Sequence, residues 1–355
     1  MRRDLAGRVL AAGQTARNFQ RLVAAELSWH VRIPLGKRLF GWRHGFTSRY
    51  TVRFDLTPEN VDDFVSDYAR YIRTPRINGP FAPALLNKLV FSRIVASHGG
   101  SVPEYYCHAG KRGLIAIGDR HDMRDADGVA AACMTGERFI VKPCGGGGGV
   151  GVAVISSRDG RLTINDSAVD DAEFRTFIGS LDNALVCEFI VQDEYASGIF
   201  PHSTNSIRVI SMWDYEKNTP FLAFAGHRFG RTSSIPVDNM SQGGMAAQVR
   251  IDSGELRSAI YSRGSVELVW YDEHPDTGAT IKGVRVPHWE DVKAGLLELA
   301  GRMSYIPYIG WDIVVTRDGF CVIEGNNYPH LGHQLFEPLL KDPRVRAFYE
   351  RHEVI

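Results

Sequence analysis

The sequence lacks the features that would place it in a membrane or in an oxidising compartment. No apolar run approaches the roughly 18 residues of a membrane-spanning helix, and no apolar signal core follows the N-terminal arginines. The five cysteines are odd in number, far apart and without a C-x-x-C pair, which argues against a disulfide framework or a zinc site. We therefore expect a cytoplasmic protein with buried thiols.

An excess of charge of one sign is also absent from the chain as a whole. Lys and Arg number 41, as do Asp and Glu, so no overall field favours nucleic acid as a partner. The first 50 residues differ, because they contain ten Lys or Arg residues against only Asp4 and Glu26. This basic stretch is compatible with a solvated helical face or with peripheral contact to an anionic membrane or partner.

The composition is that of a globular protein with a large core. The chain has 355 residues, of which 44% are hydrophobic and 23% charged, enough for two or three modules. Apolar spacing predicts one or two helices between Leu5 and Val31. Thr57 as N-cap and Pro58 at the first position predict another helix, which ends at Pro75. A stretch rich in Pro and Gly over residues 74–83 marks the first domain boundary.

The rest of the sequence alternates helical and strand patterns. Helical spacing recurs from Ala84 to Gly99 and from Trp289 to Met303, and a final helix is expected to end near Arg351. Short apolar strands are predicted within residues 105–117, 184–191, 206–213 and 221–229. The pattern predicts an α+β protein with mostly antiparallel sheets.

A glycine-rich loop is the most distinctive stretch. Lys142 follows the apolar run Phe139–Val141, and six of the seven residues from Gly145 to Gly151 are glycine. The backbone amides of such a loop can wrap a polyphosphate. The β-branched residues after the loop lack a helix cap, which favours a connection between two strands over a P-loop or Rossmann turn. The alternative interpretation is a mobile surface turn.

Residues 311–327 predict a β-hairpin that brings acidic side chains together. With a two-residue loop at residues 318–319, Asp312 points away from Glu324. With a three-residue loop ending in Gly319, Asp312 opposes Glu324, and Asn326 lies on the same face one pleat further on.

Two opposed carboxylates in apolar strands need compensation. They lie about 5 Å apart and repel each other, and burial costs each of them several kcal/mol. A divalent cation compensates, and the oxygen donors of Asp, Glu and Asn select Mg²⁺ or Mn²⁺ over zinc. The alternative is that both acids lie at exposed strand ends with arginine partners.

In combination, these motifs resemble the ATP-grasp superfamily, specifically its sugar-transfer-associated branch, which is related to alpha-L-glutamate ligases. The motifs of the superfamily run in order from Asn87 to Asn327. The branch is similar in three further motifs: Asp238-Asn239 with Gly243-Gly244, the stretch His274–Gly278, and Pro287-His288-Trp289.

The resemblance implies roles for particular residues. In such proteins two lysines and a glycine loop hold the ATP phosphates, a strand between the lobes reads adenine, and an arginine contacts the transferred phosphate. An Asp and a Glu-x-Asn pair bind the metal. The positions that match are Lys88, Lys142, Gly146, Gly147, Gly148 and Gly149 for the phosphates, Glu188, Phe189 and Ile190 for adenine, Arg208 for the transferred phosphate, and Asp312, Glu324 and Asn326 for magnesium. Lys142, Arg208 and Arg228 are the candidate catalytic residues.

Several positions stay open between a functional and a structural interpretation. Arg228 and Arg231 either clamp an anionic substrate or form structural ion pairs. His330 and His333 follow the metal strand, where an acceptor would approach, or are surface or capping histidines. The loop at Asp238 with its glycine pair either closes on the site or is an ordinary ordered loop.

Two features depart from the family pattern. The tip of the glycine loop has no Ser or Thr. No acid can be assigned to ribose, since Asp193 and Glu194 both lie near the expected place.

The resemblance implies an ATP-grasp fold with ATP between two α+β lobes. We expect a helical N-terminal region over residues 1–80, a first lobe over 81–190 and a second lobe with the metal site over 191–355. The implied function is an ADP-forming ligase that uses ATP and magnesium to activate a carboxylate as an acylphosphate and couples it to an amine or similar nucleophile in glycoconjugate, peptide or natural-product biosynthesis. The alternatives are a kinase that phosphorylates a hydroxyl and a non-catalytic ATP-binding scaffold.

Overall fold

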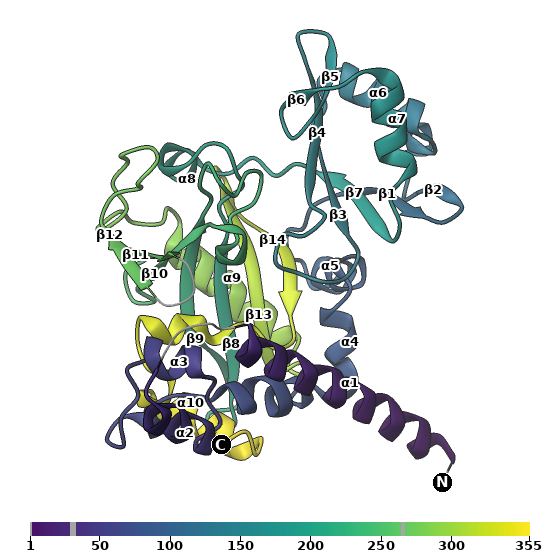
Figure 1. Cartoon of the computed structure of the whole chain (residues 1–355). Coiled ribbons are helices and arrows are strands. Elements are labelled where there is room, and N and C mark those ends of the chain that lie inside the picture. Colours follow the sequence, from purple (N-terminus) through teal and green to yellow (C-terminus); the bar gives the residue numbers. More distant parts are fainter. Residues whose placement is uncertain (1, 29–32, 264–266) are drawn as a thin grey trace.

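A computed structural model describes residues 2–28, 33–263 and 267–355. Within these residues the strands form two seven-stranded sheets, and every pairing between neighbouring strands is antiparallel (Figure 1). The α+β fold with antiparallel sheets is therefore confirmed. The division of the chain at residues 80 and 190 stays a prediction.

The first sheet has the strand order β2-β1-β7-β3-β4-β5-β6. Its strands are β1 Tyr105–Gly110, β2 Gly113–Ala116, β3 Phe139–Pro143, β4 Ala153–Arg158, β5 Arg161–Ile164, β6 Ser167–Ala168 and β7 Ala184–Glu188. Helices α6 (Ala126–Met134) and α7 (Asp171–Gly179) pack on it around a core that includes Phe139, Ile155 and Phe174. The glycine loop, residues 145–151, connects β3 and β4, as predicted.

The second sheet has the order β12-β11-β10-β9-β8-β13-β14. Its strands are β8 Ile207–Asp214, β9 Thr219–Phe229, β10 Met245–Val249, β11 Leu256–Arg263, β12 Glu267–Tyr271, β13 Tyr308–Thr316 and β14 Gly319–Asn326. Helices α5 (Lys88–Ser97) and α9 (Trp289–Arg302) bury Phe91 and Leu296 against it. Contact is so close at Gly325 that a Cβ there would lie 2.6 Å from the Phe91 ring, which explains the glycine.

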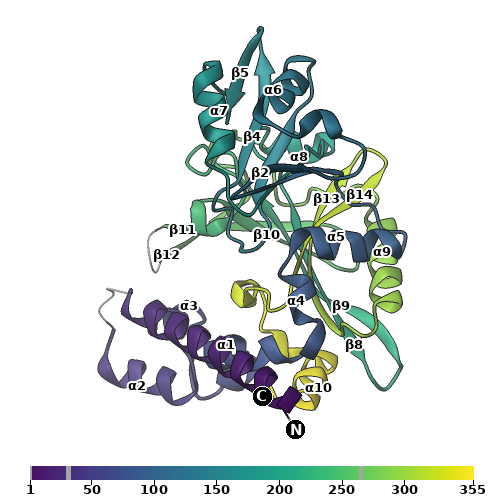
Figure 2. The same cartoon turned by 90° about the vertical axis from the view of Figure 1, so that its right-hand side faces the viewer.

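The remaining α-helices lie before the first sheet, between the two sheets or after the second sheet in the sequence. They are α1 Arg2–Leu27, α2 Leu35–Arg43, α3 Ser48–Arg53 and α4 Ala82–Leu85 before the first sheet, α8 Glu194–Ile199 between the sheets and α10 Pro343–Arg351 after the second sheet. Short helical turns are η1 Val61–Asp63, η2 Ala69–Arg73, η3 Thr74–Arg76, η4 Gly79–Phe81, η5 His121–Met123, η6 Met240–Gln242, η7 Leu331–Leu335 and η8 Leu339–Lys341. Figures 1 and 2 place α1, α2 and α3 at the end of the molecule opposite the first sheet.

The helix predicted from Pro58 to Pro75 is wrong. The chain forms the short turn η1, becomes extended at Phe64 (φ −116°, ψ 142°) and coils again only at η2. Phe64 is buried with Phe46, Tyr50 and Val61. Burial in this cluster outweighs the local helix signal, because start signals and apolar spacing are weak in comparison with tertiary packing.

The hairpin of β13 and β14 confirms one prediction and corrects another. Asp312 pairs with Glu324, as predicted. The loop consists of residues 317 and 318, which neither sequence-based alternative gave, because Thr316 pairs with Gly319. A bulge at Ile323 adds one residue to β14, since Ile313 pairs with Val322, and this restores the opposition of the two acids.

None of the helices in the described ranges is both long and apolar enough to cross a membrane.

Candidate active site

A cavity of about 170 Å³ lies between the two sheets, and most of the residues singled out from the sequence line it. They are Lys88, Lys142, Gly146, Gly147, Gly148, Gly149, Glu188, Ile190, Arg208, Arg228, Asp312, Glu324 and Asn326. Phe189 does not line the cavity, and its ring lies 4.0 Å from the Arg138 guanidinium. Segments separated by more than 200 residues are thus brought to one place.

The glycine loop forms one wall of the cavity. Gly146, Gly148, Gly149 and Gly151 have positive φ, a conformation that other residues rarely adopt. A Cβ at Gly149 would also lie 2.9 Å from Nδ2 of Asn239. Gly149 therefore meets both a conformational and a steric requirement, and the glycine loop packs against the segment that connects β9 and β10.

Lys88 begins α5, where the side chain of Asn87 caps the helix by accepting a hydrogen bond from the Val90 amide. Its Nζ lies 3.0 Å from the Gly146 carbonyl oxygen and 3.3 Å from Oε2 of Glu324. The lysine thus connects the glycine loop to the acidic strand β14.

Lys142 lies near the end of β3 and is only 8% exposed. Its Nζ is 3.5 Å from the Ile323 carbonyl oxygen and 5.2 Å from the centre of the Tyr105 ring. Burial lowers the pKa of Lys142, but attraction to Cys187, Tyr105 and Glu324 raises it by more. Lys142 is therefore a buried cation at neutral pH and can neutralise an anion.

Asp312 and Glu324 are opposed on neighbouring strands, and each has a basic partner. Arg208 makes a bidentate contact with Asp312 through Nε and a terminal nitrogen, the latter at 2.8 Å from Oδ2. Arg228 donates to the same Oδ2 at 2.9 Å. Burial raises the pKa of Asp312, whereas the two arginines lower it by more, so the net direction is downward.

These contacts agree with neither of the two sequence-based alternatives for the acids in full. Asp312 is 3% exposed, so it does not lie at an exposed strand end, yet it does have arginine partners. Among the described residues no group of three or more His, Cys, Asp or Glu side chains could hold a metal ion. Asn326 pairs with Gly310 and therefore lies on the same face as Glu324, as predicted.

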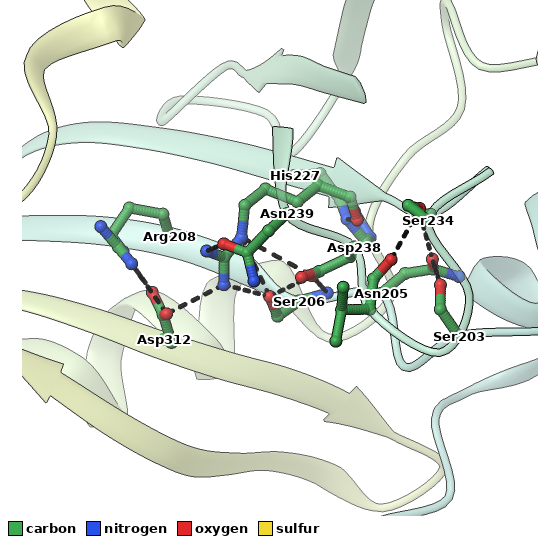
Figure 3. A network of polar contacts seen from close by, with 12 residues as sticks. Ser203, Asn205, Ser206, Arg208, His227, Ser234, Asp238, Asn239 and Asp312 are labelled. Atoms are coloured by element: carbon green, nitrogen blue, oxygen red, sulfur yellow. Dashed lines mark hydrogen bonds and ion pairs between the residues drawn. The ribbon is translucent and has the colours of Figure 1, made fainter. Parts of the chain in front are cut away.

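Arg228 contacts a polar network that includes Ser206, Asp238 and Asn239, which are labelled in Figure 3. Asp238 is buried, accepts a hydrogen bond from the Ser206 amide at 2.8 Å and lies 3.6 Å from Nε of Arg228. The Nε of Arg228 also donates to Oγ of Ser206 at 3.1 Å, and Asn239 accepts from its Nη1 at 3.3 Å. Arg228 is thus fixed by Ser206, which directly precedes β8, and by the loop between β9 and β10.

The sequence did not reveal the roles of Ser206 and Asp238. Ser206 lies two residues before Arg208, so strand periodicity could have placed it on the same face. Asp238 could not be found this way, because its partner is 32 residues distant. Gly244 is explained by close packing, since a Cβ there would lie 2.3 Å from the Asp238 carbonyl oxygen.

Other candidates lie outside the cavity. Arg231 forms an ion pair with Asp276 at 2.8 Å. Asp193 caps α8 and, like Glu194, does not line the cavity. His330 contacts the Tyr50 hydroxyl at 2.9 Å, whereas the side chain of His333 lies outside the described residues.

Two α+β lobes, each built on an antiparallel sheet, enclose a charged cavity that is lined by a glycine loop. This arrangement is the ATP-grasp fold. The sequence model of the sugar-transfer associated ATP-grasp family matches residues 68–342, and the chain belongs to this family. A search of curated proteins finds no match.

Solved structures with similar folds include three ligases or synthetases. The ADP complex of N5-carboxyaminoimidazole ribonucleotide synthetase is 12% identical, with 76% of this chain and 53% of that chain covered and a TM-score of 0.44. ATP-grasp ligase PsnB with minimal precursor, Mg and ADP is 13% identical (78% and 62% covered, TM-score 0.38). D-alanine-D-alanine ligase from Coxiella burnetii is 11% identical, with 77% of this chain and 59% of that chain covered and a TM-score of 0.39. This chain spans about half the length of the first of these.

Proposed function

We propose that the protein is an ATP-dependent ligase that activates a carboxylate as an acylphosphate and couples it to an amine or similar nucleophile. One observation carries the proposal. Four basic side chains, Lys88, Lys142, Arg208 and Arg228, line a single cavity together with the glycine loop. Phosphoryl transfer requires positioning and charge neutralisation more than covalent help, and this cavity offers both.

The lysines and the arginines have different roles in the proposed reaction. Lys88 and Lys142 hold the phosphates beneath the glycine loop, since both lie at its base and one bonds the Gly146 carbonyl. Arg208 and Arg228 stabilise the transferred phosphoryl group, because Asp312 fixes their orientation before the substrate binds. Preorganised donors of this kind need no rearrangement at the moment of reaction.

The acidic strand pair fits a hard divalent cation. Asp312, Glu324 and Asn326 line the same cavity and offer carboxylate and amide oxygens, the ligands that Mg²⁺ and Mn²⁺ prefer. Magnesium bound there supplies neutralisation of the phosphate charge. Lys88 and the two arginines balance the same acids in the structure described here.

The proposed reaction consists of two displacement steps. A substrate carboxylate oxygen forms a bond to the γ-phosphorus of ATP, and the bond between this phosphorus and the β,γ-bridging oxygen breaks, with its electron pair leaving on ADP. The amine then attacks the acyl carbon, the carbon–oxygen bond to phosphate breaks, and inorganic phosphate leaves. The proton of the amine passes to solvent.

The test is an ADP-release assay with magnesium ATP and pooled carboxylates, with and without hydroxylamine. The proposal requires carboxylate-dependent ADP formation and a hydroxamate in the presence of the trap. A stable phosphorylated alcohol without hydroxamate would replace the ligase with a kinase. Binding of ATP without any turnover over a broad substrate panel would instead favour a scaffold.

A further inference from the structure

Helix α1 turns a row of apolar side chains to the solvent. Phe19, Val23 and Leu27 are 52%, 41% and 71% exposed, and their spacing of four residues puts them on one face of the helix. Large apolar residues exposed singly are ordinary, but a continuous row on one helix face is not.

The exposure does not result from a detached helix. The opposite face of α1 contacts the body of the protein, where Asn18 donates to the Tyr71 carbonyl oxygen at 3.0 Å. Near the end of α1, Glu26 accepts a hydrogen bond from the Ser48 amide at 2.7 Å. These buried or half-buried contacts fix the rotation of the helix, so the apolar row is held outward.

Helix α2 repeats the pattern. Leu35, Leu39 and Trp42 are 67%, 52% and 48% exposed at positions i, i+4 and i+7. A surface depression of about 480 Å³ lies next to this row, with Leu39, Phe40 and Val61 among its lining residues. Trp is enriched at membrane–water interfaces.

Basic residues accompany both rows. Arg17 on α1 and Arg43 on α2 are exposed, and Arg43 also lines the depression. The first 50 residues carry ten Lys or Arg against two acidic residues, one of which, Glu26, is bound to Ser48. The segment that carries both apolar rows therefore has an excess of basic residues, although Asp62 also lines the depression.

We propose that the two apolar rows, Phe19, Val23 and Leu27 on α1 and Leu35, Leu39 and Trp42 on α2, form with Arg17 and Arg43 an apolar-basic surface that docks the protein peripherally on an anionic lipid membrane. Amphipathic helices with large apolar residues and a basic rim bind in the plane of such an interface. Two copies of this chain are a poorer fit for the same surface, because their contact would bring like charges together. Figures 1 and 2 show both helices at the end of the molecule opposite the first sheet.

The experiment is sedimentation of the full chain with vesicles of phosphatidylcholine alone or mixed with phosphatidylglycerol. We expect binding to the anionic vesicles only, weakened by salt. Arg17→Gln with Arg43→Gln should lower the partition coefficient about five-fold for each residue replaced. Val23→Ser with Leu27→Ser should lower it at least about ten-fold.

The matched control replaces two apolar residues of the first lobe, Ile115→Ser with Met134→Ser, which are 61% and 48% exposed, against 41% and 71% for Val23 and Leu27. It should bind vesicles like the unchanged protein. Circular dichroism and a thermal unfolding curve verify that each variant is folded, independently of the ligase proposal and of the nucleotide site.

Three results would overturn the proposal: no binding to anionic vesicles, equal binding to neutral ones, or an equal loss in the control. A dimer that the α1 variant abolishes, without vesicle binding, would assign the surface to contact between copies instead.

Discussion

Replacing Lys142 by alanine removes a buried cation from the centre of the proposed site. At about 5 Å from a phosphate charge, with an effective dielectric constant of about 20, one positive charge contributes about 3 kcal/mol. Since 1.36 kcal/mol corresponds to ten-fold in rate, Lys142→Ala should slow turnover by at least about 100-fold. The raised pKa of Lys142 means that the unchanged enzyme keeps this charge at mildly alkaline pH.

The assay is ADP release with magnesium ATP and an accepted carboxylate. Lys142→Met keeps most of the apolar stem and should be as slow as the alanine variant, which separates loss of charge from loss of packing. Lys111→Ala, at an exposed turn of the same sheet, is the matched control and should keep near-normal turnover. Near-normal turnover in Lys142→Ala, or recovery in Lys142→Met, would show that turnover does not depend on the positive charge of Lys142.

Three further predictions concern the metal strand, the glycine loop and a buried histidine. Glu324→Ala should also lower turnover at least about 100-fold, measured by ADP release, and unchanged turnover would remove this acid from the site. Gly149→Ala should destabilise the protein by about 1–3 kcal/mol in a denaturant titration, because its φ is +76° and the new Cβ would lie 2.9 Å from a neighbouring side chain. Gly147→Ala, with no atom within 4 Å of its Cβ and no positive φ, is the control, and an equal effect of both would contradict the steric argument. Burial lowers the pKa of His227 from 6.5 to about 3. Protonation below pH 6.5 therefore favours the unfolded chain, and up to about 5 kcal/mol of stability is lost as the pH falls from 6.5 towards 3. His227→Gln should flatten this part of the urea-unfolding profile, and an unchanged slope would show that other groups cause the loss.

Local sequence signals predicted the parts of the fold that depend on neighbouring residues. The strands around the glycine loop and the helix beginning at Trp289 follow from side-chain periodicity and glycine content, which act within a few residues. The opposition of Asp312 and Glu324 was correct although the predicted loop was wrong, because the bulge at Ile323 compensated for the shorter turn. A bulge depends on the packing of the whole sheet, so hairpin rules alone could not place it.

Tertiary contacts determine the features of the fold and of the site that local sequence signals did not predict. Phe64 interrupts the expected helix because it packs with Phe46 and Tyr50, which are remote from the helix start signal. Similarly, Asp238 supports Arg228 through Ser206, and no spacing rule joins residues so far apart.

Isothermal titration with Mg-ADP tests directly whether the cavity between the two sheets holds the nucleotide, and it requires no knowledge of the other substrates. We predict one binding site per chain, with affinity that depends on magnesium, falls at least about ten-fold in Lys142→Ala and is unchanged in Lys111→Ala. Absence of binding, or equal affinity in Lys142→Ala and the unchanged protein, would contradict the account.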